Sequence, residues 1–135
     1  MSKWKVVDRE DDMNVISSTW DFRLKRYPYA FINKFKARFC ARGGMQLEGI
    51  DFFETYAPVL QWTTVRLMLI LEFFLGLKSK QGNVTAAFLH ANLGKDEKVF
   101  VEMSRGFKVK GKNGRTRVLK LLKTLYGLRQ SHRAF

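Results

Sequence analysis

The chain has 135 residues, of which 46% are hydrophobic and 14% aromatic, values that favour one folded domain and exclude wholesale disorder. Twenty-five Lys and Arg residues against twelve Asp and Glu give a net charge of +13, which is typical of proteins that bind a polyanion, most often nucleic acid. The single cysteine, Cys40, excludes an internal disulfide and a Cys-rich zinc site.

Targeting and membrane segments are not expected. The N-terminus has no apolar signal core, and the longest apolar run, Leu67–Leu77, is shorter than the roughly twenty residues that a membrane span needs. We therefore expect an intracellular protein, cytoplasmic or nuclear, with no membrane partner.

The positive charge is concentrated in two blocks. Residues 21–42 carry seven bases and one acid, and residues 101–135 carry ten bases and one acid. The segments 1–14 and 43–100 each have a net charge of −1. This distribution fits a groove lined from two sides, and it also fits two solvated flanks around an apolar middle.

Residues 15–41 are expected to form a β-hairpin around a turn at 27–30, where Pro28 fixes φ. After Thr19 the first strand alternates between apolar and charged side chains, with Trp20, Phe22 and Leu24 opposed to Asp21, Arg23 and Lys25. The return strand, 31–41, places Lys34, Lys36 and Arg38 on one face, about 7 Å apart at the rise of a strand.

The middle of the chain predicts one helix. Thr63 or Thr64 can cap it, and the following residues are apolar on nearly every side, so we expect a buried helix at about 64–77. Gly76 stands where a C-terminal cap is expected.

Further strands are expected at 78–87, 98–103 and 117–122, with a helix opening at Leu125. Together with the hairpin, these elements predict an α+β fold with mixed and antiparallel strands. Residues 1–13 are taken as a polar N-terminal segment and residues 14–135 as one domain.

Catalytic nucleophiles and metal sites have little support in the pattern. Cys40 lies in the middle of a strand, where a structural thiol is expected, and the short acidic clusters fit solvated turns or caps. Lys34, Lys36 and Arg38, with Arg42 beyond them, can contact successive phosphates or a triphosphate tail. They also fit the solvated face of an edge strand whose lysines discourage aggregation, and spacing alone does not choose between the two.

Five segments, in chain order, resemble the reverse transcriptase region of copia-type retrotransposon polyproteins. They are Trp20 with its basic strand, KARFCARGGMQLEGIDFFETYAPVLQWTTVRLML, TAAFLHANL, VFVEMSRGF and LKTLYGLRQSHRAF. The resemblance covers about residues 14–135. It implies a partial right-hand polymerase, with the fingers and part of the palm.

The resemblance also implies roles for the basic strand. Lys36 and Arg38 would bind the phosphates of an incoming deoxynucleoside triphosphate. Lys34 and Arg42 would contact the template or primer, which is RNA, DNA or an RNA–DNA hybrid.

Further along the chain, Tyr126, Gly127 and Gln130 would border the nucleotide pocket by the same resemblance. The family places an aspartate that holds two Mg²⁺ or Mn²⁺ ions where this chain has Asn83, whose neutral amide cannot replace the carboxylate charge. The family's YxDD hairpin has no counterpart in these 135 residues. We therefore expect no metal cofactor in this chain.

Three functions remain open at this point. The first is a remnant of an RNA-directed DNA polymerase that is catalytically inactive as this chain. The second is a non-catalytic nucleic-acid-binding module, and the third is a fragment of a longer, active retrotransposon polyprotein.

Overall fold

The computed structural model describes residues 2–135 and contains a four-stranded sheet, a two-stranded hairpin and few helices. The fold class is therefore α+β, as expected. The strands are β1 (Trp4–Val7), β2 (Val15–Ile16), β3 (Ser18–Arg26), β4 (Ile32–Ala41), β5 (Phe100–Glu102) and β6 (Val118–Leu121). The helices are η1 (Gly43–Met45), α1 (Trp62–Leu75), η2 (Ala87–His90) and α2 (Ser131–Ala134), of which η1 and η2 are short 3₁₀ helices.

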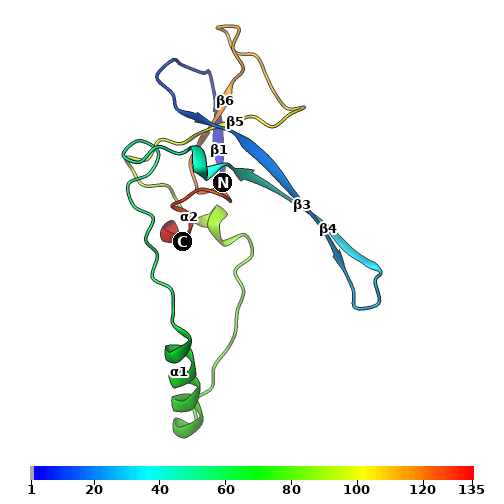
Figure 1. Ribbon diagram of the computed structural model, residues 1–135, viewed down its shortest axis with the longest axis vertical. Coiled ribbons are helices and arrows are strands. Elements are labelled where there is room, and N and C mark those ends of the chain that lie inside the picture. The colour runs from blue at the N-terminus through cyan, green and yellow to red at the C-terminus, as the bar shows by residue number, and fades with distance from the viewer. Residues whose placement is uncertain (1) are drawn as a thin grey trace.

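The four-stranded sheet, in the order β1-β6-β5-β2, carries the hydrophobic core (Figure 1). β6 pairs antiparallel with both β1 and β5, whereas β2 pairs parallel with β5. The segment 125–128 packs against this sheet, so the core joins the middle and the end of the chain. Its buried members include Ile16, Val99, Val101, Met103, Leu119, Leu121, Leu125 and Leu128.

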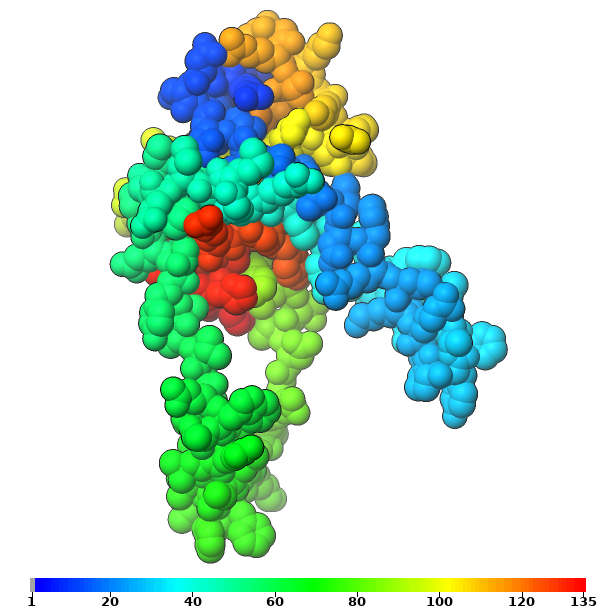
Figure 2. Space-filling view, viewed as in Figure 1, coloured from blue at the N-terminus to red at the C-terminus, as the bar shows by residue number. Residues whose placement is uncertain are grey.

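β3 and β4 confirm the predicted hairpin, which extends as an arm away from the four-stranded sheet (Figures 1 and 2). At its tip the backbone N–H of Tyr27 donates to the carbonyl of Phe31 at 2.9 Å, and Ala30 adopts a positive φ of 66°. The register places Trp20 opposite Phe39 and Asp21 opposite Arg38. Apolar and charged side chains therefore lie on opposite faces of the arm.

The helix predicted at about 64–77 forms, but the prediction that it is buried is wrong. The helix, α1, spans Trp62–Leu75 and none of its residues is buried; Phe73 is 84% exposed. It ends as expected, because Gly76 caps it in the left-handed conformation with a φ of 63°, but Gln61 rather than a threonine is its N-cap. A helix that is apolar on all sides is normally buried, but its burial also requires other elements of the fold to pack against it.

α1 is joined to the rest of the molecule by two extended segments and projects away from the sheet (Figures 1 and 2). No helix among residues 2–135 has both the length and the apolar character needed to cross a bilayer.

The strand expectations have mixed outcomes. β5 and β6 confirm the strands predicted at 98–103 and 117–122, although both are shorter. No strand forms at 78–87, where an unpaired segment leads into η2. The C-terminal helix begins only at Ser131 rather than at Leu125. The N-terminal segment contributes β1, which the sequence pattern did not predict and which pairs with β6 at the opposite end of the chain.

Candidate nucleic-acid interface

One face of the hairpin arm collects five bases from its two strands. Alternation along β3 and β4 directs the side chains of these residues to the same side, and they run from near the tip to the base of the arm. They are Arg23, Lys25, Lys34, Lys36 and Arg38, and we call this surface the basic face.

Like charges stand directly opposite each other on the basic face. Lys25 pairs in register with Lys34, and Arg23 pairs with Lys36. Such pairs destabilise an antiparallel ladder, whereas opposite charges support it. The pKa of Lys36 is accordingly lowered, first by the guanidinium of Arg38, then by desolvation and by the charges of Lys25 and Lys34. Asp21 is the one acid on this face, and it pairs with Arg38 at 2.9 Å and with Arg23 at 3.3 Å, so a net positive charge remains on the basic face.

Arg38 lies at the base of the arm and links the hairpin to the C-terminal motif. Its guanidinium donates to the carboxylate of Asp21 at 2.9 Å and lies over the ring of Tyr126, 5.7 Å from the centroid. The hydrogen bond from Arg38 is the largest of the effects that hold the pKa of Asp21 below its ordinary value. The structure thus brings together two of the predicted site residues, Arg38 and Tyr126, which are far apart in the sequence.

Backbone contacts fix this junction between β4 and the segment 126–127. The N–H of Ala41 donates to the carbonyl of Tyr126 at 2.8 Å, and the N–H of Gly43 donates to the carbonyl of Gly127 at 3.1 Å. Gly127 has a φ of +88°, and a Cβ there would overlap the carbonyl oxygen of Ala41. Glycine is therefore required at this position both for its conformation and for the close approach of two backbones.

The side chain of Gln130, which the resemblance implied would border the nucleotide pocket, is buried, and both polar atoms of its amide form hydrogen bonds. Its Oε1 accepts a hydrogen bond from Gln46 at 3.0 Å, and its Nε2 donates to the carbonyl of Asp51 at 2.9 Å. Gln130 thus ties the C-terminal motif to the segment that follows η1.

Asp51 and its partner Asn14 join the same network, and the sequence did not predict either of them as a site residue. The carboxylate of Asp51, which is fully buried, accepts the side-chain N–H of Asn14 at 2.5 Å and the backbone N–H of Leu47 at 2.8 Å. Together with the bond from the N–H of Asp51 to the carbonyl of Leu47, this contact closes the loop between residues 47 and 51. The only signal in the sequence was the position of Asp51 in a glycine-containing loop.

Lys34 and Arg42 are both exposed, Lys34 near the tip of the arm and Arg42 just beyond its base. Cys40 lies near the base of the arm and is half-buried, and its backbone forms an isolated parallel β-bridge with Tyr126. Burial raises the pKa of its thiol, which favours the protonated, unreactive form and agrees with a structural role.

Asn83 is exposed in the unpaired segment between α1 and η2. Its donor is a neutral amide, and within residues 2–135 no three His, Cys, Asp or Glu side chains gather as a metal site would require. Mg²⁺ and Mn²⁺ prefer several charged oxygen ligands at one point, so the residues present around Asn83 do not fit a two-cation centre.

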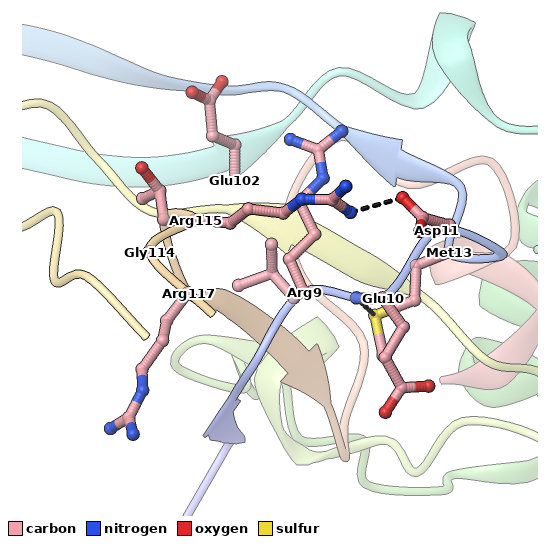
Figure 3. Close-up of a pocket in the computed structure, with 10 residues that line it drawn as sticks. Arg9, Glu10, Asp11, Met13, Glu102, Gly114, Arg115 and Arg117 are labelled. Atoms are coloured by element: carbon pink, nitrogen blue, oxygen red, sulfur yellow. Dashed lines mark hydrogen bonds and ion pairs between the residues drawn. The ribbon is translucent and has the colours of Figure 1, made fainter. Parts of the chain in front are cut away.

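A cavity of about 540 Å³ lies between the turn after β1 and the loop before β6 (Figure 3). Two of its arginines pair with N-terminal acids: Arg115 pairs with Asp11, and Arg117 pairs with Asp8 at 2.8 Å. Lys108 is paired with Glu102 at 2.5 Å. Part of the C-terminal basic block is therefore paired within the fold, as Arg23 and Arg38 of the basic face are with Asp21.

Comparison with known proteins places the chain in a family. The model of the family described as reverse transcriptase (RNA-dependent DNA polymerase) matches residues 1–135. The chain is 37% identical over 130 residues to the retrovirus-related Pol polyprotein from transposon TNT 1-94 of Nicotiana tabacum, covering 96% of this chain and 10% of that protein. It is 33% identical over 123 residues to the corresponding polyprotein from transposon RE1 of Arabidopsis thaliana, covering 91% of this chain and 8% of that protein.

A shorter relative shares only part of the chain. An uncharacterized mitochondrial protein of Arabidopsis thaliana is 36% identical over 66 residues, which is 49% of this chain and 39% of that protein. None of the solved structures matches the chain. The chain spans about a tenth of the length of the Pol polyproteins that it matches. With the whole sequence matched by the family model, the chain belongs to the reverse transcriptase family and corresponds to part of the reverse transcriptase region of copia-type retrotransposon Pol polyproteins.

Proposed function

We propose that the basic face of the hairpin is the polyanion-binding surface of a reverse transcriptase fingers region. Lys36 and Arg38 would bind the phosphates of a deoxynucleoside triphosphate, and Lys34 and Arg42 would contact an RNA, DNA or RNA–DNA template or primer. In this proposal the arm belongs to the fingers, and the segments that follow it belong to part of the palm.

The observation that carries this proposal is the pairing of like charges across the arm. A solvated edge strand needs only scattered lysines to discourage aggregation. It gains nothing from placing Lys25 opposite Lys34 and Arg23 opposite Lys36, because each like-charged pair opposes the hairpin. Bound phosphates would relieve that repulsion and accept charge-assisted hydrogen bonds, so the arrangement favours a polyanion ligand.

The contact between Arg38 and Tyr126 supports the second part of the proposal. It places the C-terminal motif at the base of the basic face, where a triphosphate held by Lys36 and Arg38 would present its base or sugar. Tyr126 and Gly127 would border that pocket. Gln130, being buried, would hold the wall of the pocket in place rather than contact the nucleotide.

The test is binding of labelled duplex, hybrid and single-stranded oligonucleotides to the full chain, followed by fluorescence anisotropy over a range of salt concentrations. Affinity should fall steeply with salt, because phosphate contacts release counterions. Replacing Lys34, Lys36 and Arg38 by Ala should weaken binding. It should also make the slope of log K against log salt concentration shallower, by up to the contribution of about three phosphate contacts.

A matched control removes the same charge elsewhere. Arg66, Lys78 and Lys80 are exposed in and after α1, and their replacement by Ala lowers the net charge equally. If both triple variants lose affinity alike, net charge rather than the basic face determines binding, and the proposal is wrong. If anionic vesicles displace bound oligonucleotides as effectively as unlabelled oligonucleotides do, the surface would be assigned to membranes instead.

We also propose that these 135 residues bind nucleotide without extending a primer. Asn83 supplies no carboxylate, and a single aspartate at this exposed position would still lack the partners of a two-cation site. Primer extension should therefore be absent from the wild type and from Asn83→Asp with Mg²⁺ or Mn²⁺. Extension by either protein above a mock-purified control would favour the active-polymerase alternative.

A further inference from the structure

The face of the hairpin opposite the basic face forms part of an aromatic hollow. The hollow has a volume of about 310 Å³ and lies between β1, the base of the arm and the loop after β5. Its walls are almost entirely apolar, and four of its lining residues are aromatic: Trp4, Trp20, Phe39 and Phe107. Since the residues of β3 and β4 alternate, Trp20 and Phe39 point away from the cations of the basic face.

Trp20 is held in place by its neighbours in this hollow, and the rings of Trp20 and Phe107 are exposed to solvent. Trp20 lies 5.3 Å from Phe39 between ring centroids, and its indole N–H donates to the hydroxyl of Ser104 at 2.6 Å. That hydrogen bond fixes the plane of the indole. Trp20 is 41% exposed and Phe107 is 69% exposed, whereas rings that only complete a core would be shielded from water.

Two unpaired cations stand beside the hollow. Trp20 and Ser104 also line an adjoining polar hollow of about 390 Å³, whose other walls include Arg42 and Arg105. Neither Arg42 nor Arg105 forms an ion pair within residues 2–135. The surface therefore offers aromatic faces and free guanidinium groups side by side.

We infer that this surface binds an unpaired base of single-stranded RNA or DNA, with the base on the aromatic rings and the neighbouring phosphate on Arg42 and Arg105. Aromatic rings beside a positively charged track are the arrangement with which proteins hold single strands. The volume of the hollow is at the lower end of the range of about 300–1,000 Å³ for ligand pockets. The bases of a duplex are stacked inside it, so a duplex could contact only the cations of this surface. The surface should therefore bind single strands in preference to duplexes.

This inference extends the proposed function to a second face of the arm, and the two can fail separately. The probes are a short thymidine strand and a strand of equal length that carries the same phosphates but no bases. The thymidine strand should bind roughly tenfold more tightly, since stacking of one base on an aromatic ring gives about 1–3 kcal/mol. Phe107→Ala should bring the ratio of the two affinities, thymidine strand over strand without bases, toward one. Phe107→Tyr should retain the wild-type ratio.

Two control variants match these changes elsewhere on the surface. Phe73, which is 84% exposed on α1, can be replaced by Ala without touching the hollow, and the ratio should then stay at its wild-type value. Arg105→Ala should weaken binding of both strands, whereas Arg66→Ala, which removes an exposed arginine of α1, should not.

Equal affinity for the two strands in the wild type would overturn the inference while leaving the basic face intact. A ratio that Phe107→Ala does not change would overturn it as well. If neither strand binds at low salt, the proposed function fails together with it. Self-association that Phe107→Ala abolishes, measured by sedimentation, would assign the hollow to a second copy of the chain and so refute the inference.

Discussion

Gly127 is the position at which a single added methyl group should do most damage to the junction between the arm and the C-terminal motif. In Gly127→Ala the new Cβ would overlap the carbonyl oxygen of Ala41, which is backbone and cannot rotate away. The substitution would also hold an alanine at a φ of +88°. The two segments would have to separate, and the hydrogen bond from Ala41 to Tyr126 would break with them.

The expected cost follows from these two effects. A left-handed conformation costs a non-glycine residue about 1–2 kcal/mol. The loss of the bonds that Ala41 and Gly43 donate across the junction adds about 1 kcal/mol for each. We therefore expect a destabilisation of about 3–4 kcal/mol, which is a large part of the total stability of roughly 5–15 kcal/mol for a domain.

The assay is urea unfolding followed by tryptophan fluorescence, with Gly106→Ala as the matched control. Gly106 has nearly the same φ, +86°, but an added Cβ there would meet nothing within 4 Å. Gly106→Ala should therefore show only the conformational cost of about 1–2 kcal/mol. Equal destabilisation by the two substitutions would show that the close backbone approach at Gly127 is not what stabilises the junction.

Four further outcomes are expected. Gln130→Ala should lower the free energy of unfolding by about 2–4 kcal/mol in urea titrations, because two buried polar partners lose their hydrogen bonds; an unchanged midpoint would contradict this. Asp21→Asn should bind oligonucleotides more tightly at neutral pH by releasing Arg38, as anisotropy would show. Because Arg38 lowers the folded-state pKa of Asp21 below its ordinary value of 3.8, the ion pair should stabilise the wild type above that value and cease to do so as the pH falls through the lowered pKa. Phe73→Glu should reduce self-association in sedimentation without loss of helical circular dichroism, since this side chain is 84% exposed on α1.

The hairpin could be predicted from the sequence because everything that determines it is local. Strict alternation after Thr19, a proline-containing turn and alternation again in the return strand set both the register and the two faces. The capping role of Gly76 was predictable for the same reason, since one residue in the left-handed conformation ends the helix.

Features that depend on distant partners could not be predicted from local pattern. β1 pairs with β6 from the other end of the chain, and the short run Trp4–Val7 carries no signal of that pairing. The burial of α1 depends on a surface that the helix does not itself contain. The hydrogen bonds of Gln130 to Gln46 and Asp51 likewise join segments that are far apart in the sequence, so local pattern did not predict them.

The separation of cations and rings onto two faces of one arm makes their contributions experimentally distinct. Contacts between Lys34, Lys36 or Arg38 and phosphates weaken as salt rises, because screening and counterion release act on charges. Stacking on the rings beside Phe107 has no such dependence. As salt rises, the remaining affinity for a thymidine strand should therefore become less sensitive to replacement of Lys34, Lys36 and Arg38 and more sensitive to Phe107→Ala. Titrations of the two variants at low and high salt measure this, and a sensitivity to Phe107→Ala that falls with salt in step with that of the lysines would mean that the aromatic surface does not hold a base.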